Sequence, residues 1–167
     1  AEVGDGAYVV ARLPQGIERT AARFPRLTFR AAGDDVAFAA LLDAVIDARG
    51  RQLARDPGAR DAKVSLGSAL SARGRDDEAL PIFRALAGEN DPDGWYNLGT
   101  ILVRRGADDE AADAFRRALA VDPTMAPARH NLGLVLARSG RLPEAIAELR
   151  EGVRREPDSE VALYTLG

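Results

Sequence analysis

One long phrase occurs twice in the sequence, the second time 34 residues after the first. Residues 95–123 read WYNLGTILVRRGADDEAADAFRRALAVDP, and residues 129–157 read RHNLGLVLARSGRLPEAIAELREGVRREP. Small, bulky and turn-forming residues keep their order, whereas the polar residues between them change. Leu-Gly pairs mark the copies at spacings of 32, 34 and 34: Leu66-Gly67, Leu98-Gly99, Leu132-Gly133 and Leu166-Gly167. Such a repeat predicts small identical units, each of which buries its apolar face against a neighbour.

Each unit is predicted to form a helix, a tight turn and a second helix. In the second unit, apolar or small residues stand at i, i+3, i+4 and i+7, which places them on one face of a helix. These residues are Trp95, Leu98, Gly99 and Leu102. A glycine follows each first helix, where the C-terminus of a helix favours a residue that tolerates positive φ. The three glycines are Gly74, Gly106 and Gly140.

The second helix of each unit is predicted to begin with acidic residues or an early proline and to stop before a proline. Aspartate stabilises a helix N-terminus, and proline fits the first turn of a helix but not its continuation. The starts are Asp76-Asp77, Asp108-Asp109 and Pro143, and the stops are Pro123 and Pro157. Pro81 lies inside the second helix of the first unit and is expected to bend that helix or to delay its start.

Small residues recur where the two helices of a unit are expected to cross. Glycine and alanine let helix axes approach closely, and aromatic side chains fill the wider gaps. The small residues are Gly67, Gly99, Gly133, Ala79, Ala111 and Ala145. We therefore interpret Phe83, Trp95 and Phe115 as core residues rather than as a stacking platform for a ligand.

This pattern resembles the tetratricopeptide repeat family, whose units read W-x2-L-G-x2-Y, then A-x3-F, then P. The second unit matches it at Trp95-x2-Leu98-Gly99-x2-Leu102, Ala111-x3-Phe115 and Pro123, with Leu102 in place of the aromatic residue. The first unit departs most, since Lys63 stands where the second unit has Trp95. The resemblance covers residues 60–167 and implies an all-α, right-handed superhelical array of helix-turn-helix repeats.

The expected organisation adds an N-terminal extension to this array. Short extended pieces are predicted at 7–13 and 26–30, with a short helix between Pro14 and Pro25, and a long helix from Asp34 that stops at Pro57. The expected segments are 1–33 as an extension of undefined fold, 34–59 as a long capping helix or degenerate repeat, 60–91, 92–125 and 126–159 as repeats, and 160–167 as the start of a further repeat or capping helix. Because the array stops within a helix, we expect a longer parent chain.

The composition argues against several classes of function. The net charge is −3 with both signs interspersed, which argues against a nucleic-acid surface. There is no cysteine, and the single histidine, His130, has no neighbouring cluster of metal ligands. The sequence contains neither a phosphate-binding loop nor an apolar run of the roughly 20 residues that span a bilayer. We therefore expect no enzyme activity, cofactor, metal site or membrane span, while the compartment, cytoplasmic or periplasmic, is not predicted.

Candidate partner-binding residues lie on the first helices, on the face opposite the core leucines. Equivalent positions of stacked repeats align into ladders on one concave surface. The candidates are Tyr96, Asn97, Thr100 and Arg104 in the second unit and His130, Asn131, Leu134 and Arg138 in the third. Arg104 and Arg138 are expected to attract acidic side chains or a carboxylate.

The resemblance implies a role for the two asparagines. In several tetratricopeptide proteins, asparagines at this repeat position hold the backbone of a bound peptide, and Asn97 and Asn131 resemble them. The alternative is that these amides only satisfy local hydrogen bonds. A chaperone-binding clamp, which uses Lys and Asn in the first repeat and Lys and Arg in the third, is not indicated. The matching positions here are Val64 and Ser68, then Pro127 and Asn131, and only Asn97 agrees with the clamp pattern.

The sequence thus predicts a non-catalytic protein–protein interaction scaffold that binds an extended or helical segment of a partner in a concave groove. Its basic residues are arginine except for Lys63, a bias typical of GC-rich bacterial genomes. Three alternatives stay open. The chain is the interaction arm of a larger enzyme, it self-assembles through the half-repeat at 160–167, or its own segment GAYVVARLP (6–14) occupies the groove.

Overall fold

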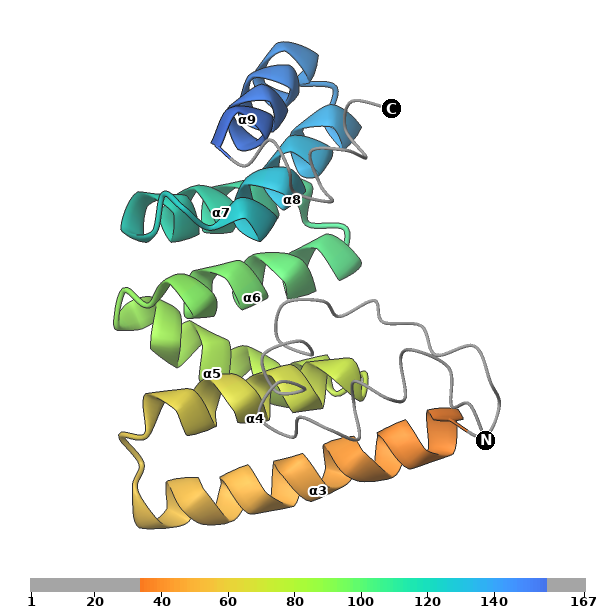
Figure 1. The fold of residues 1–167 in the computed structure, drawn as a ribbon, viewed down its shortest axis with the longest axis vertical. Coiled ribbons are helices and arrows are strands. Elements are labelled where there is room, and N and C mark those ends of the chain that lie inside the picture. The colour runs from red at the N-terminus through yellow and green to blue at the C-terminus, as the bar shows by residue number, and fades with distance from the viewer. Residues whose placement is uncertain (1–33, 156–167) are drawn as a thin grey trace. The chain divides into compact units, whose positions relative to one another are not determined.

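The computed structural model describes residues 34–155, and this part of the chain consists of seven α-helices joined by short turns (Figure 1). The helices are α3 (Asp34–Arg55), α4 (Arg60–Ala72), α5 (Asp76–Gly88), α6 (Pro92–Arg104), α7 (Asp108–Val121), α8 (Ala126–Arg138) and α9 (Leu142–Arg155). The predicted all-α repeat fold is therefore confirmed. The pieces expected at 7–13, 26–30 and 160–167, and the helix between Pro14 and Pro25, lie outside the described residues.

The chain divides into two compact units, residues 1–83 and 84–167, with the boundary inside α5. In the first unit α3 packs against α4, and Leu42 of α3 is buried. Arg73, which follows α4, donates from Nε to Asp43 of α3 at 2.8 Å and from Nη2 at 3.2 Å. The helix α3 ends at Arg55, as Pro57 predicted, because proline disfavours helical backbone in the residue before it.

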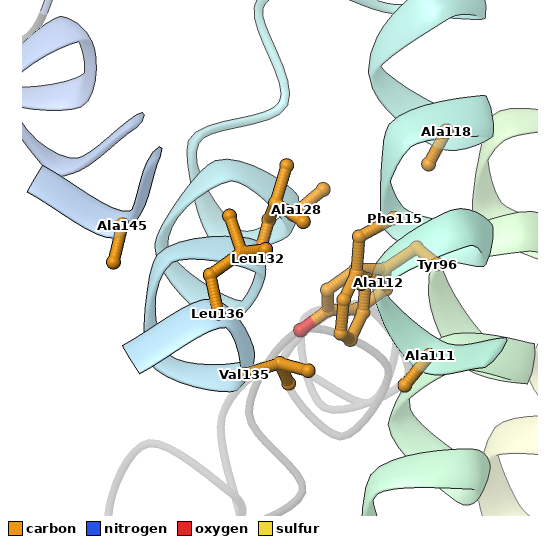
Figure 2. Packing of buried hydrophobic residues seen from close by; sticks show 10 residues of the cluster. All are labelled: Tyr96, Ala111, Ala112, Phe115, Ala118, Ala128, Leu132, Val135, Leu136 and Ala145. Carbon is orange, nitrogen blue, oxygen red and sulfur yellow. The ribbon is translucent and has the colours of Figure 1, made fainter. Parts of the chain in front are cut away.

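In the second unit each helix packs against the next, from α6 to α9, and α6 also contacts α8. Figure 2 shows the core that results, with side chains from α6, α7, α8 and α9 in one cluster. The ring of Phe115 is fully buried there, and Trp95 is partly buried against the same cluster. The prediction that the aromatic residues fill the core is confirmed for both.

Close approach between the two helices of one repeat depends on glycine at one position. A Cβ atom at Gly99 would lie 2.8 Å from Cε1 of Phe115, and one at Gly133 would lie 2.7 Å from Cγ of Leu149. Such distances are shorter than van der Waals contact, so no larger residue fits without movement of a buried side chain. The first unit repeats the arrangement, with a Cβ at Gly67 2.7 Å from Cζ of Phe83.

The turns after the first helices use positive φ, as predicted. At Gly106 φ is 74°, a value that side chains with a Cβ atom rarely adopt. The N–H of Gly106 donates to Val103 O at 3.1 Å, and the N–H of Ala107 donates to Leu102 O at 3.0 Å. These bonds satisfy carbonyl groups that the end of α6 leaves open, so the chain can turn at once into α7.

The starts of the second helices show how the aspartates act. Asp108 and Asp109 lie in the first turn of α7, where a negative charge is favoured by the helix dipole, but the N-cap residue is Ala107 and makes no capping bond with its side chain. Pro81 does not delay α5, which begins at Asp76. A true side-chain cap occurs at Asp91, which accepts from the N–H of Gly94 at 3.0 Å and opens α6.

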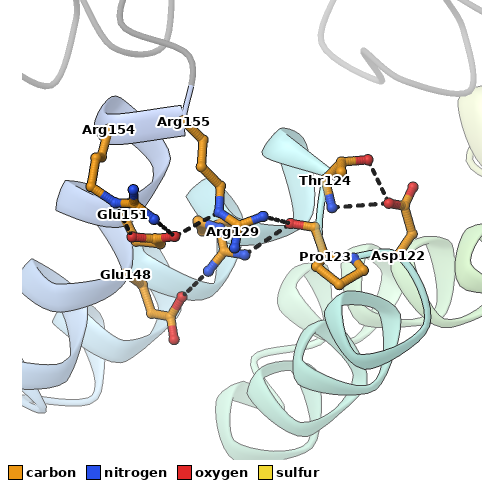
Figure 3. A network of polar contacts seen from close by, with 8 residues as sticks. All are labelled: Asp122, Pro123, Thr124, Arg129, Glu148, Glu151, Arg154 and Arg155. Carbon is orange, nitrogen blue, oxygen red and sulfur yellow. Dashed lines mark hydrogen bonds and ion pairs between the residues drawn. The ribbon is translucent and has the colours of Figure 1, made fainter.

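A polar network ties the turn between α7 and α8 to α8 and α9 (Figure 3). The carbonyl oxygen of Pro123 accepts from Arg129 and from Arg155, both at 3.0 Å. Arg155 also donates to Glu151 at 2.6 Å, and Glu151 accepts two further bonds from Arg154 at 2.7 Å each. The turn is therefore fixed by the end of α9 as well as by the hydrophobic core.

The close approach at Gly99 predicts a large and local effect of a single methyl group. Gly99→Ala should lower the free energy of unfolding by about 1–3 kcal/mol, because the buried ring of Phe115 must move. Urea unfolding followed by the fluorescence of Trp95, the single tryptophan, measures this change. The matched control is Gly88→Ala at the end of α5, where a Cβ atom meets nothing within 4 Å and stability should stay the same or rise by up to about 1 kcal/mol. Equal stability of the two variants would contradict the packing account.

The arginine bonds of Glu151 predict a pH dependence with a defined sign. Hydrogen bonds from Arg154 and then Arg155 lower the pKa of this carboxyl from about 4.5 to about 2. The stabilisation is therefore present above pH 4.5 and is lost as the pH falls towards 2, because the unfolded chain takes up the proton first. Glu151→Gln should lower the urea midpoint at neutral pH and much less at about pH 3. A difference from wild type that is equal at both pH values would contradict this assignment.

Candidate functional site

The candidate site consists of equivalent faces on two neighbouring helices of the second unit. We call Tyr96, Asn97, Thr100 and Arg104 the α6 face, and His130, Asn131, Leu134 and Arg138 the α8 face. On α8 these residues lie opposite Leu132 and Leu136, which point into the core in Figure 2. Because α6 and α8 are in contact, the structure brings the two faces onto adjacent helices.

The α6 face is mostly covered. Tyr96 is 5% exposed, and its ring lies 6.0 Å from that of Phe115 in a tilted arrangement (Figure 2). Asn97 is 8% exposed. Tyr96 therefore belongs to the hydrophobic cluster, and of the four residues of the α6 face only Arg104 is exposed.

Polar atoms of the α6 face are bonded within their own helix. The Nδ2 group of Asn97 donates to Asp93 O at 2.8 Å, and the Oγ1 group of Thr100 donates to Tyr96 O at 3.0 Å. Both bonds run from a side chain to the carbonyl four residues earlier. The amide of Asn97 thus makes a local hydrogen bond, which was the alternative to peptide binding in the interpretation of the sequence.

The α8 face is open by comparison. Leu134 is apolar and yet 50% exposed. Its neighbours on the helix surface are the polar residues His130, Asn131 and Arg138. Asn131 is only partly buried, and within residues 34–155 its amide takes part in no hydrogen bond. At this repeat position, the amide of Asn97 is therefore bonded within its own helix, whereas the amide of Asn131 bonds to no described residue.

The arginines at the ends of the two faces are engaged within the chain. Arg138 donates from Nε to Asp108 Oδ2 at 2.6 Å, and its Nη2 donates to the other oxygen of the same carboxylate. This bidentate bond raises the pKa of Arg138. Arg104 is exposed but also interacts within the chain. The carboxylate that Arg138 was expected to attract is thus already present on the first turn of α7.

His130 is the single histidine and is half-buried. Its Nδ1 atom is shielded from solvent and has no hydrogen-bond partner in the described part of the chain. Burial lowers the pKa of His130 below 6.5, because the charged imidazolium loses its hydration. The neutral ring is therefore the main form at pH 7, and within residues 34–155 its Nδ1 atom has no partner that would orient it as a general base.

Two regions of the sequence, residues 35–94 and 96–160, match the family model described as "Tetratricopeptide repeat". The chain belongs to the tetratricopeptide repeat family. Two solved structures, titled "Crystal structure of MamA" and "Crystal structure of MamA protein", have similar folds. Their TM-scores are 0.64 and 0.62 and their identities 23% and 20%; the matches cover 78% and 89% of this chain and 77% of each of the other chains. No curated protein sequence matches significantly.

Tetratricopeptide repeats act in general as scaffolds for protein interactions, and the match of both regions to the family model supports such a role for this chain. Among the residues that the structure describes, no helix is sufficiently long and apolar to cross a bilayer. The same residues contain no group of three or more side chains that could hold a metal ion.

Sequence reasoning on the tetratricopeptide units missed two side-chain contacts, of which the first involves a residue of the α8 face. One is the pairing of Arg138 with Asp108, which are 30 residues apart. The other is the guanidinium of Arg117, which lies 4.8 Å from the ring centroid of Trp95 and covers this core residue from outside. The structure contains a comparable pair 65 residues earlier, Asp43 with Arg73 (108 − 43 and 138 − 73), but the sequence alone indicated neither pair.

The burial of His130 predicts its titration directly. Because this is the single histidine, its imidazole signals in an NMR titration need no further assignment. The midpoint should lie below 6.5, since desolvation favours the neutral ring. A midpoint at or above 6.5 would show that the ring is solvated or has an acidic neighbour that the described residues do not supply.

Proposed function

We propose that this chain is a non-catalytic scaffold whose second unit binds an extended segment of a partner protein across α6 and α8. The observation that carries the proposal is the amide of Asn131, which bonds to no residue within 34–155 and lies beside the half-exposed side chain of Leu134. Polar groups that lie partly buried without a protein partner are favourable places for a ligand to form hydrogen bonds. The family role as an interaction scaffold supports the same conclusion.

The chemistry of Asn131 suits a peptide backbone. An amide side chain offers both a donor and an acceptor, which match the C=O and N–H groups of any residue in the partner. Binding through these groups does not depend on the partner's sequence, so neighbouring contacts supply specificity. The helix α8 is held by the core and by the hydrogen bond that Arg129 donates to Pro123 O, so the amide is positioned before the partner arrives.

The α6 face makes a smaller contribution in this proposal. Asn97 keeps its Oδ1 atom as an acceptor, because only its Nδ2 group is used in the bond to Asp93. Thr100 and Arg104 border the partner, while Tyr96 supports the surface from within the core. We therefore infer that a partner segment lies mainly on α8 and reaches α6 at its edge.

The proposal predicts unequal effects at the two asparagines. Asn131→Ala should weaken partner binding by about tenfold, the equivalent of one or two lost hydrogen bonds, without a change in melting temperature. Asn97→Ala should weaken binding less and lower stability by about 1 kcal/mol, because it removes the bond to Asp93. Affinity capture from a lysate of the source organism identifies the partner, and titration with the purified partner then measures each affinity.

The control for this experiment is Glu110→Ala, an exposed change on α7 outside both faces. It should leave binding unchanged. If Asn131→Ala binds the partner as tightly as wild type does, the proposal is wrong. Self-assembly becomes the better account if the molar mass rises with protein concentration and no partner is retained, whereas an enzyme arm is indicated by activity that appears only in a longer chain.

A further inference from the structure

The charges of the α8 face indicate what kind of segment it selects. Resting on the proposed function, we infer that the α8 face recognises an uncharged extended segment that seats an apolar side chain on Leu134. In this inference Arg138 stabilises the packing of α8 on α7 and does not bind an acidic group of the partner. This reverses the sequence-based expectation for Arg138 and gives the partner a defined chemistry.

Leu134 is the apolar centre of the face. It lies four residues after His130, three after Asn131 and four before Arg138, and residues at these spacings are neighbours on a helix surface. Half of its side chain is exposed, while Leu132 and Leu136 on the other side of α8 are almost completely buried. A partner side chain that covered Leu134 would remove apolar surface of both molecules from water.

Arg138 is already neutralised where a partner would approach. Its guanidinium binds the carboxylate of Asp108 in the bidentate manner that gives arginine its strongest polar contacts. Asp108 is itself favoured at this place, because it lies in the first turn of α7 near the positive end of the helix dipole. An acidic partner side chain would meet a guanidinium whose charge Asp108 already offsets, so it would gain little.

The same pairing in the first unit shows that it belongs to the stacking of helices. Arg73 follows α4 and binds Asp43 of the preceding helix α3 with two hydrogen bonds. Arg138 ends α8 and binds Asp108 of the preceding helix α7 in the same way. A contact that recurs between a first helix and the helix before it is explained by helix packing and needs no ligand.

The rest of the α8 face carries no net charge. His130 is neutral at pH 7, and the Asn131 amide is uncharged. In an extended segment, side chains on one side recur every second residue, about 7 Å apart. A segment whose backbone is bonded by Asn131 therefore places a side chain within reach of Leu134, and an apolar residue fits there best.

Selection from a display library of random peptides against the full chain tests this inference. Peptides enriched on wild type should carry an apolar residue and no excess of Asp or Glu. Their affinity should fall by about tenfold on Leu134→Ser and should be kept on Leu134→Met. On Arg138→Gln it should change by less than about twofold. Since Leu134 is half exposed, circular dichroism should show that Leu134→Ser is folded.

A second variant tests the inference through a gain of binding to acidic peptides. Asp108→Asn leaves Arg138 without its carboxylate, so this variant alone should enrich acidic peptides. Acidic peptides that bind wild type and are lost on Arg138→Gln would overturn the inference while the proposed function stands. If no enriched peptide depends on Asn131 or Leu134, both the inference and the proposed function fail.

Discussion

The close approach of two helices at a glycine is the constraint on which the rest of the structure depends. At Gly99 and Gly133 the facing side chain lies so near the backbone that a methyl group would overlap it. This contact fixes how deeply the second helix of each unit settles on the first. The core of the second unit, with Phe115 at its centre, follows from it (Figure 2). The outward face of α8 is then determined, because it lies opposite Leu132 and Leu136, which the core holds.

The two faces are equivalent in sequence and unequal in the structure. Asn97 is buried and its Nδ2 group donates to Asp93 O, whereas Asn131 is partly exposed and bonds to no described residue. Thr100 bonds to its own helix, whereas Leu134 at the equivalent place is half exposed. We therefore propose that partner binding is concentrated on α8. A repeat scaffold can in this way use one unit for packing and the next for recognition, without any change in the framework residues.

Helix positions could be predicted from the sequence because they depend on local signals. Gly106 marks the end of α6 by its positive φ, and Pro57 and Pro123 mark where α3 and α7 stop. The division of the binding face could not be predicted, since Asn97 and Asn131 occupy the same repeat position. They differ in burial, since Asn97 is 8% exposed and Asn131 is only partly buried, and burial in the folded chain is not recorded in a local pattern. The role of Arg138 was hidden for a similar reason, because its partner Asp108 had a sufficient local explanation as the start of a helix.

The central claim is that a partner segment lies over the α8 face, and site-specific photo-crosslinking tests it most directly. A benzoylphenylalanine at position 134 would stand among His130, Asn131 and Arg138, and one at position 110 would project from the exposed surface of α7. The account predicts that irradiation in a lysate of the source organism joins a partner protein to position 134 and not to position 110. Crosslinks of equal yield at both positions, or at position 110 alone, would contradict it.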